Sequence, residues 1–390
     1  MSQNGTTPEP TKGTQLSTVQ PYDEEPKPLP LANSDDEDTR SGQSDVGSAL
    51  ARHESIPDAA SLASIDRPPS EGEKLPPAKV YHPYSISVLS LLMPVSVLGC
   101  LARLGLEALV TFDGRSIFPL AWVQVGGCFV MGFALGAREP IGRFYGPIYT
   151  AITTGFCGSF TTFSSWQFAV FQAWINSGHY HRDWLRDVID GLTQIVFTLA
   201  LSLSAVQFGA HISSLIRPFF PTLPSPNRTI RYGLNIFSII FYAATYPAYF
   251  RLPEAYREKA TSALLYSFPG TLTRYVLSIQ LNNRFSLFPV GTFSANMLGT
   301  ALIGMFMVLQ STRGPPSPNA CNVLSGLANG YCGCLTTVST FAAEVAALEN
   351  KKSWFYAILS IVVAQLLLLV ILGPSYWAGN VSEQTTCAYV

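Results

Sequence analysis

Two short runs of glycine, serine and threonine interrupt apolar stretches of this chain, and their backbones could do chemistry. The runs are residues 158–162 and 333–337. Such a run is a poor continuous helix, and membrane segments tolerate it where the unwound backbone is buried or lines a cavity. If the two breaks faced each other, their carbonyl oxygens would suit a bare monovalent cation. Ordinary packing of small residues between helices explains the same composition equally well.

Two arginines, Arg103 and Arg274, stand within apolar stretches. A charged side chain inside a membrane segment is costly, so it is a functional hypothesis by default. Both guanidinium groups could line vestibules and attract anions. The alternative is that each side chain reaches the membrane surface and takes no part in ion selection. Glu107, one turn after Arg103, offers an ion-pair partner, whereas the residue at that spacing after Arg274 is Ser278.

The composition changes sharply along the chain. The 390 residues are 48% hydrophobic and only 13% charged, about half the charged fraction of soluble domains. Residues 1–80 hold 14 of the 25 acidic side chains and are predicted to be a disordered, acidic, cytoplasmic tail. Residues 81–390 hold 17 bases and 11 acids, a net charge of +6. This apolar part predicts a polytopic membrane protein whose surroundings are a lipid bilayer.

Nine apolar stretches are long enough to cross a bilayer, since about twenty helical residues span its hydrocarbon core. Open sheets cannot exist there, so the predicted fold class is an all-α polytopic membrane protein. The stretches are approximately residues 86–110, 118–137, 147–177, 185–209, 231–250, 259–281, 288–310, 319–348 and 353–373.

Short patterns recur in the same order in two parts of the chain, which indicates an internal repeat. The matches are 99–103 with 270–274, 124–127 with 296–299, 155–164 with 330–339, and Ser202 and Gln207 with Ser360 and Gln365. We therefore predict a first four-span repeat at 86–210 and a second at 259–373. Each repeat has a broken third helix, and a linker transmembrane helix at 231–250 joins the two.

The linker span sets the relative orientation of the repeats. A four-span unit returns the chain to its starting side, so one further crossing inverts the second copy. With a cytoplasmic N-terminus, the inner loops and the flank before the first span hold ten Lys and Arg side chains, and the outer loops hold seven, which favours this orientation. The short tail at 374–390 would then be extracellular, and Asn380 within it is a candidate glycosylation acceptor.

The seven cysteines lie mostly within apolar stretches. Their positions predict no disulfide framework, and Cys332 and Cys334 stand too close in sequence for the usual pair of zinc ligands. The chain also shows no phosphate-binding loop, nucleophile elbow or basic nucleic-acid patch. We therefore expect neither enzymatic activity nor a nucleic-acid partner.

The pattern Gly-Phe-Cys-Gly-x-x-Thr-Thr-Phe-Ser at 155–164, with Gly-x-x-x-Arg upstream and Asn-x-x-Gly at 296–299, resembles the Fluc/FEX fluoride channel family. The resemblance covers residues 86–373 and is greatest to the eukaryotic single-chain form. It implies a fused pseudo-dimer that works as a monomer in the plasma membrane, with fluoride as its partner. It also implies a central structural sodium ion held by backbone carbonyls, which here belong to Gly158, Thr161, Gly333 and Thr336.

The resemblance further implies two fluoride pathways, each lined by one Phe from each repeat. An aromatic ring has a positive edge, which can stabilise a small anion weakly without trapping it. In this chain one pathway keeps Phe163 and Phe341, whereas the other has Trp166 and Val338 at these positions. We therefore predict one working pore and one degenerate pore.

Polar residues show the same asymmetry. The family's asparagine is present as Asn296, and its counterpart is Gln124 in the degenerate pore. A glutamate near the second Phe position is present as Glu344, and its counterpart is Ala169. Amide and hydroxyl donors can replace part of fluoride's water shell, although a helical serine can bond to its own backbone instead. The predicted lining of the working pore also includes Thr337, Ser339 and Ser360.

The predicted function is passive, selective export of fluoride from the cytosol, which gives fluoride resistance. Two alternatives stay open. A proton-coupled secondary transporter of a small anion fits inverted repeats and broken helices equally well, and Glu344 is the ionisable group that it would use. A membrane scaffold would show no ion flux, and the breaks would then be packing elements only.

Overall fold

The computed structural model describes residues 81–111, 118–180, 183–221, 223–282, 284, 287–314, 316–379 and 381–388. The predicted tail at 1–80 and the candidate acceptor Asn380 lie outside the described residues. All described residues belong to one unit, 54–390. Their regular elements are helical apart from one isolated bridge between Thr312 and Val381, so the described fold is all-α.

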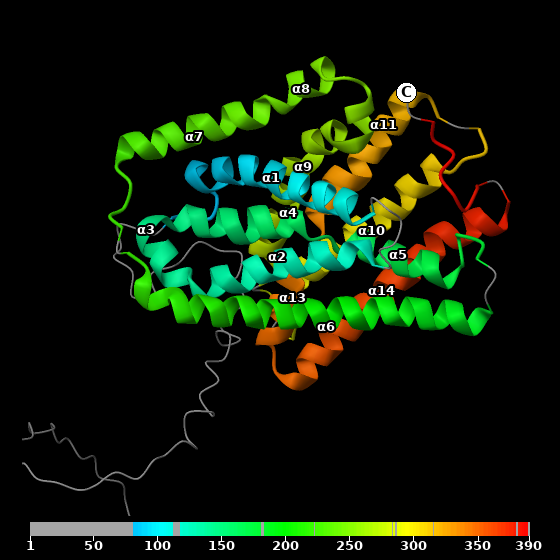
Figure 1. The fold of residues 1–390 in the computed structure, drawn as a ribbon, viewed down its shortest axis with the longest axis horizontal. Coiled ribbons are helices and arrows are strands. Elements are labelled where there is room, and N and C mark those ends of the chain that lie inside the picture. The colour runs from blue at the N-terminus through cyan, green and yellow to red at the C-terminus, as the bar shows by residue number, and fades with distance from the viewer. Residues whose placement is uncertain are drawn as a thin grey trace, which may run out of the picture. The chain divides into compact units, whose positions relative to one another are not determined.

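The first half consists of two long helices, a broken stretch and a third long helix (Figure 1). Its elements are α1 (Ile86–Thr111), α2 (Pro119–Gly136), α3 (Arg138–Thr150), the π-turn η3 (Ala151–Cys157), α4 (Gly158–Phe160), α5 (Phe163–Trp174), α6 (Trp184–Ile216) and the 3-10 turn η4 (Arg217–Phe219). α6 lies along α2 and also contacts α5.

The second half has the same order of long and broken elements. Its elements are the π-turn η5 (Arg257–Thr261), α9 (Ser262–Leu281), α10 (Val290–Gln310), α11 (Pro318–Gly326), the π-turn η6 (Leu327–Cys332), α12 (Gly333–Leu335), α13 (Ser339–Ala347) and α14 (Asn350–Trp377). α14 lies along α10, and α9 lies against η6 and α12.

The linker between the halves contains two consecutive helices with a helical backbone at Ala244 between them, and the single span at 231–250 stays a prediction. The two helices are α7 (Arg228–Ala243) and α8 (Thr245–Arg251). α7 begins where the side chain of Asn227 accepts a hydrogen bond from Ile230 N at 3.0 Å, the usual way to satisfy a first-turn amide. α7 lies along α1 (Figure 1), and the Ser90 hydroxyl donates to Asn235 Oδ1 at 2.9 Å between them.

Each broken stretch ends its first part in the same way. The short helix α4 stops at Thr161, whose backbone is extended with φ −87° and ψ 156°. The short helix α12 stops at Thr336, with φ −94° and ψ 151°. A π-turn precedes each short helix, and such turns often occur at functional sites. The structure therefore has a break at each of the two runs that the sequence singled out.

Close packing of α2 on α6 depends on glycine. A Cβ added to Gly132 would overlap the carbonyl oxygen of Val206, and a Cβ added to Gly209 would overlap the backbone of α2. The counterpart of Gly132 in the second half is Gly304, where the nearest atoms would be side-chain carbons of α14 at 3.3 Å. The first half therefore packs these two helices more tightly than the second does.

Several helices are long and apolar enough to cross a membrane, as expected of a membrane protein. By length and composition, those among the described residues are Ile86–Val110, Trp184–Phe219, Val290–Gln310 and Asn350–Trp377. The bent pair Leu120–Gly136 and Arg138–Trp174, with 106° between its parts, is a fifth if it is counted as one span. Nine crossings therefore stay a prediction.

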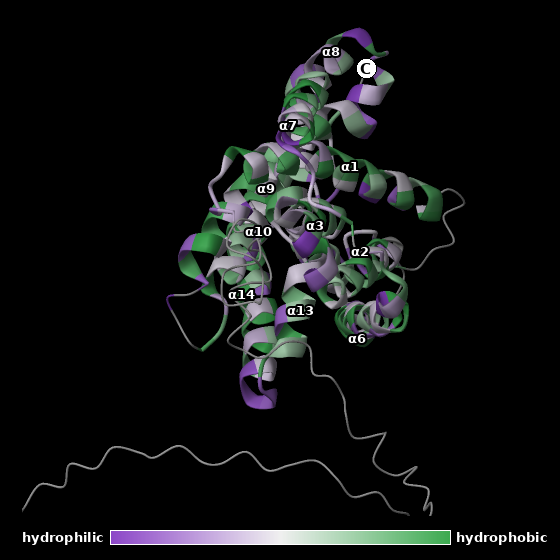
Figure 2. Ribbon diagram, turned by 90° about the vertical axis from the view of Figure 1, so that its left-hand side faces the viewer, coloured by the Kyte–Doolittle hydropathy of each residue, from purple (hydrophilic) through white to green (hydrophobic). Residues whose placement is uncertain are grey.

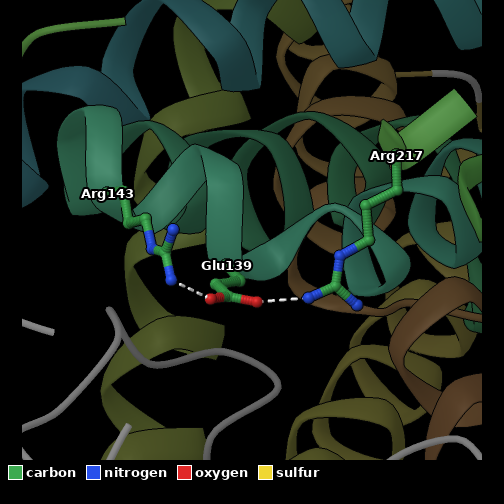
Figure 3. A network of polar contacts seen from close by, with 3 residues as sticks. All are labelled: Glu139, Arg143 and Arg217. Carbon is green, nitrogen blue, oxygen red and sulfur yellow. Dashed lines mark hydrogen bonds and ion pairs between the residues drawn. The ribbon is translucent and has the colours of Figure 1, made fainter. Parts of the chain in front are cut away.

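Polar residues gather where these helices end. Glu139, at the start of α3, accepts hydrogen bonds from Arg143 and from Arg217 after α6 (Figure 3). All three side chains are at least 42% exposed, so each ion pair contributes only about 0–1 kcal/mol. The turn between α13 and α14 carries the hydrophilic colour in Figure 2, and Lys352 pairs there with Glu349 at 3.4 Å.

The C-terminal segment 381–388 is fastened to the second half, which the sequence did not predict. Cys387 forms a disulfide bond with Cys321 at the start of α11. Thr386 N donates to the carbonyl oxygen of Gln310, the last residue of α10, at 3.0 Å. The expectation of no disulfide was therefore wrong for this pair. The two cysteines are 66 positions apart, and only the folded path of the chain brings them together.

Candidate functional site

The two breaks meet inside the fold. Thr162 Oγ1 lies 3.2 Å from Thr336 Oγ1, and Thr161 Oγ1 lies 3.1 Å from Thr337 Oγ1. All four side chains are completely buried. α4 and α5 contact α12, so segments about 175 positions apart in the chain share one interior site.

An amide side chain holds each break through the same pair of hydrogen bonds. Gln124 on α2 donates to Thr162 O at 2.7 Å and accepts from Thr162 N at 3.3 Å. Asn296 on α10 donates to Thr337 O at 3.2 Å and accepts from Thr337 N at 2.9 Å. Backbone groups lose their helical partners where a helix stops, and the amide replaces both. The two residues therefore share one structural role, although the sequence assigned them to different pores.

The glycine three residues after each amide makes room for a threonine. A Cβ on Gly127 would overlap the methyl group of Thr161, and a Cβ on Gly299 would overlap the methyl group of Thr336. Residues three apart lie on the same face of a helix, so the amide and the glycine contact the same break. This geometry accounts for the recurring amide-x-x-Gly pattern in physical terms.

The two arginines are buried deep in the fold rather than exposed in open vestibules. Arg103 is 2% exposed and Arg274 is 0% exposed. Arg274 donates to Thr154 O at 2.6 Å and to Cys334 O at 3.0 Å, while Arg103 donates to Asn329 O. Each guanidinium thus bonds to a carbonyl of the π-turn in the opposite half.

Glycines at the breaks receive these guanidinium groups. A Cβ on Gly158 would overlap Arg274, and a Cβ on Gly333 would overlap Arg103. Arg103 therefore bonds across to the second half. A buried cation needs polar partners, and the carbonyls of the π-turns supply them.

The backbone oxygens at the breaks could hold a monovalent cation. The last carbonyls of a helix lack intrahelical donors and carry partial negative charge. Carbonyls at the ends of broken helices coordinate sodium in membrane transporters. Of the four residues predicted to supply carbonyls, Gly158 and Gly333 begin α4 and α12, and Thr161 and Thr336 follow the last residues of these helices. This donor set fits a bare cation, although the neighbouring guanidinium groups oppose its positive charge.

The described residues contain no cluster of three or more His, Cys, Asp or Glu side chains that could hold a metal ion.

Four aromatic or apolar side chains fill the space beside the breaks. The rings of Phe163 and Phe341 lie edge to face with centroids 5.5 Å apart, and both are completely buried. Trp166 lies 5.5 Å from Phe163, and its indole N–H donates to Gln194 O at 3.3 Å. Val338 packs in the same buried cluster. The structure therefore brings all four predicted pore residues together, with the two Phe rings in direct contact.

A polar cluster adjoins Phe341. The Phe341 ring lies 5.1 Å from the ring of Tyr356 on α14. The Tyr356 hydroxyl donates to Glu344 Oε2 at 2.8 Å, and the Thr292 hydroxyl donates to Glu344 Oε1 at 2.6 Å. Glu344 is completely buried, so these donors compensate a group whose burial alone is costly. Sequence reasoning found Glu344 but missed Thr292 and Tyr356.

The first half has no equivalent of this polar cluster. At the matching positions stand Leu120 for Thr292, Ala169 for Glu344 and Thr198 for Tyr356. Of the three polar groups in the second half, the first half keeps only a hydroxyl, that of Thr198. The signal that could have found the cluster was therefore available in the sequence, as a comparison of the two repeats at every polar position.

Three further predicted residues lie in the second half. Thr337 and Ser339 lie at the break, with their hydroxyl oxygens 3.1 Å apart. Ser360 on α14 is 1% exposed, and its hydroxyl has no hydrogen-bond partner among the described residues. Ser360 therefore does not show the bond to its own helix that was the alternative for it.

Comparison with known proteins identifies the family. The family model described as CrcB-like protein, camphor resistance, matches residues 90–210 and again residues 261–374. The chain belongs to the CrcB-like, or Fluc/FEX, family. The two matched ranges of this CrcB-like protein contain the two breaks described above.

Named relatives of this CrcB-like chain come from fungi and bacteria. Fluoride export protein 1 of Neurospora crassa is 32% identical over 355 residues, covering 76% of this chain and 68% of that protein. Fluoride export protein 1 of Candida albicans is 28% identical, covering 76% of this chain and 81% of that protein. The fluoride-specific ion channel FluC of Escherichia fergusonii is 34% identical over 113 residues, 29% of this chain. No solved structure matches this chain.

Proposed function

We propose that this chain is a passive, selective fluoride channel that exports fluoride from the cytosol and so gives fluoride resistance. The names of its relatives support fluoride as the transported ion. The single observation that carries the proposal is a buried series of ring contacts that ends beside the buried carboxylate of Glu344. Phe163 contacts Phe341, and Phe341 contacts Tyr356 beside Glu344.

The working pore uses this pathway. The ring edges of Phe163 and Phe341 would stabilise fluoride weakly, which conduction requires. The unpartnered hydroxyl of Ser360 and those of Thr337 and Ser339 would replace part of its hydration shell. Asn296 takes part by holding the backbone of the break in place.

The second pathway is degenerate in this proposal. Trp166 and Val338 replace its two Phe rings, and Ala169 replaces its glutamate. The indole of Trp166 is larger than a Phe ring and is anchored through Gln194. These substitutions support a closed or non-conducting second route.

The proposed architecture is an inverted pair of four-span repeats that works as a monomer in the plasma membrane, with nine crossings in total. The repeats are 86–210 and 259–373, and α7 with α8 provides the linker crossing. The N-terminus is cytoplasmic and the tail 374–390 is extracellular. The disulfide of Cys387 supports an extracellular tail, since the cytosol keeps most thiols reduced.

A structural sodium ion at the breaks is part of the proposal. The carbonyls of Gly158, Thr161, Gly333 and Thr336 would hold it, and its charge would bind the two halves together there. The proposed driving force needs no ATP. An inside-negative membrane potential drives an anion outward with about 2.3 kcal/mol per charge per 100 mV.

Growth of a fluoride-sensitive yeast that lacks its own exporters tests the proposed function in cells. Expression of this chain is expected to restore growth in fluoride, and expression of Phe341→Ile is expected to restore much less. Surface expression of both proteins is checked by biotinylation. No rescue by a well-expressed parent chain would contradict the proposal.

A proton-coupled transporter is the second candidate, and the burial of Glu344 between Thr292 and Tyr356 favours it specifically. A channel moves fluoride without a coupled proton, so an imposed pH gradient should not accumulate fluoride against its own gradient in sealed vesicles. Accumulation that Glu344→Gln abolishes would favour the coupled transporter.

A further inference from the structure

The hydroxyl of Thr161 lies at the start of the pore helix of the opposite half. It accepts hydrogen bonds from Val338 N at 3.2 Å and from Ser339 N at 3.1 Å, the amides of the residue before α13 and of its first residue. It also donates to Cys157 O at 3.0 Å, the carbonyl one turn before it. One side chain thus links the end of the first broken helix to the beginning of α13.

The hydroxyl of Thr336 makes the same contacts in the other direction. It accepts from Phe163 N at 3.2 Å and from Ser164 N at 3.1 Å, the first amides of α5. It also donates to Cys332 O at 3.0 Å. The first amides of a helix have no intrahelical partner and need an acceptor. Here that acceptor comes from the other repeat.

The threonine next in sequence serves its own half instead. Thr162 Oγ1 accepts from Ser165 N at 3.4 Å, and Thr337 Oγ1 accepts from Thr340 N at 3.4 Å. The two threonines at each break therefore have different partners. The second hydroxyl accepts a hydrogen bond from the amide three residues later in its own half. The first hydroxyl accepts from the amides at the start of the helix in the opposite half.

We propose that the hydroxyl groups of Thr161 and Thr336 are positioning groups, each of which seats the opposite repeat's pore helix so that the rings of Phe163 and Phe341 meet. This inference rests on the proposed fluoride function. Phe163 itself donates to Thr336, and α13 carries Phe341 and Glu344. The hydroxyl role is separate from any carbonyl role of the same two residues.

This arrangement makes each pore helix depend on both repeats. An amphipathic helix that is held only by packing can shift along its axis, whereas paired hydrogen bonds at its first turn fix its start. The rings of Phe163 and Phe341 meet edge to face, with their centroids 5.5 Å apart. A small displacement of either α5 or α13 therefore separates them.

Valine substitutions test the role, because Val keeps the shape of Thr and its backbone carbonyl while removing the hydroxyl. Thr161→Val and Thr336→Val are each expected to slow fluoride efflux from liposomes by about tenfold or more, and Thr161→Ser and Thr336→Ser to restore it to within about threefold of the parent. Thr153→Val is the matched control. Its buried hydroxyl bonds only to Tyr149 O on its own helix, so efflux should stay near the parent rate.

Hydrogen exchange measured by mass spectrometry gives a readout that does not need fluoride. Thr161→Val should speed exchange at the start of α13 and leave the start of α5 unchanged, while Thr336→Val should do the reverse. This crossed pattern would establish the hydrogen bonds from Thr161 and Thr336 to the opposite helices even if the parent protein carried no fluoride. Failure of the proposed fluoride function can therefore be told apart from failure of this inference.

Three results would overturn the proposal. The first is hydrogen exchange that rises only in the mutated half, and the second is fluoride efflux in both valine variants equal to that of Thr153→Val. If the valine variants do not fold, Thr161→Ala and Thr336→Ala replace them. The third result is that these alanine variants also fail to fold while the serine variants fold, because the hydroxyls would then have a purely structural role.

Discussion

At the scale of single residues, selectivity in this account comes from neutral groups. In the proposed pore, the ring edges of Phe163 and Phe341 and the hydroxyl of Ser360 would offer fluoride weak, partial positive charge. The two full positive charges in the interior, Arg103 and Arg274, bond instead to carbonyls of the π-turns. Strong binding at a fixed cation would slow release of the anion, so weak sites suit conduction.

The two pathways should respond differently to the loss of an aromatic ring. Phe341→Ile removes a ring edge of the proposed working pore, and fluoride efflux should fall by about tenfold or more. Trp166→Ile alters only the degenerate route, and efflux should stay within about threefold of the parent. Initial efflux rates at matched protein density measure both. The opposite pattern would reverse the assignment of the two pores.

The amide side chains of Gln124 and Asn296, which hold the two breaks, should contribute similarly to stability. Asn296→Leu and Gln124→Met each leave a buried backbone N–H and C=O without partners. Each substitution should cost about 1–3 kcal/mol. Thermal unfolding followed by fluorescence of a thiol-reactive dye checks this. A loss for Asn296→Leu alone would show that Gln124 is not an equivalent clamp.

Sequence patterns identified most residues of the candidate site but not their partners. The runs at 158–162 and 333–337 predicted breaks because glycine and clustered hydroxyls disfavour a continuous helix, and the structure has both breaks. The side-chain contacts were not predictable in this way. Thr292 and Tyr356 reach Glu344 from two other helices, and no local pattern records which helices will meet.

At the scale of helices, small residues decide how closely elements approach. α2 and α6 touch along their backbones at Gly132 and Gly209, whereas α10 and α14 are separated by side chains near Gly304. This difference belongs to packing rather than to hydropathy, since both pairs come from apolar stretches. Apolar length therefore predicted that these helices exist, and it could not predict how tightly each pair packs.

A matched pair of glycine substitutions tests this asymmetry. Gly132→Ala places a methyl group against the carbonyl of Val206, which is backbone and cannot rotate away. We expect a loss of about 1–3 kcal/mol from overpacking. Gly304→Ala meets only side-chain carbons at 3.3 Å, which can adjust, and its melting temperature should stay near that of the parent. Equal destabilisation by both would contradict the packing described here.

The disulfide should stabilise the second half without taking part in transport. Cys387→Ser opens a loop of 66 positions, and its loss should cost about 2–4 kcal/mol. Fluoride efflux at room temperature should persist, because neither cysteine is among the residues of the proposed pore. Differential scanning fluorimetry with and without a reductant measures the loss. If the melting temperature of the parent protein is the same with and without the reductant, the result would contradict the presence of the disulfide bond.

That bond also shows a limit of sequence reasoning. Cys321 and Cys387 are separated by a broken stretch and by α14, and sequence alone gives no measure of the distance between them.

At the scale of the whole molecule, the account depends on two halves that complete each other. Each half supplies one break, and α5 of the first half and α13 of the second supply the facing rings. The family model matches twice along the chain, once in each half. Fusion of two copies into one chain lets their residues diverge, so one pathway can keep its function while the other loses it.

The proposed orientation has its own test. A membrane-impermeant maleimide applied to intact cells after mild reduction should label Cys387, because the proposed tail is extracellular. The Cys387→Ser variant serves as the control for labelling at other cysteines. Labelling of Cys387 only after permeabilisation would place the tail in the cytosol and contradict the proposed orientation.

Fluoride efflux from liposomes tests whether this chain conducts fluoride selectively. The purified chain is reconstituted into vesicles loaded with potassium fluoride, valinomycin balances the charge, and a fluoride electrode follows release, with chloride-loaded vesicles as the control. The account predicts fast fluoride efflux that Phe341→Ile slows, and chloride efflux no faster than from protein-free vesicles. No fluoride efflux from well-folded protein, or equal release of chloride, would contradict it.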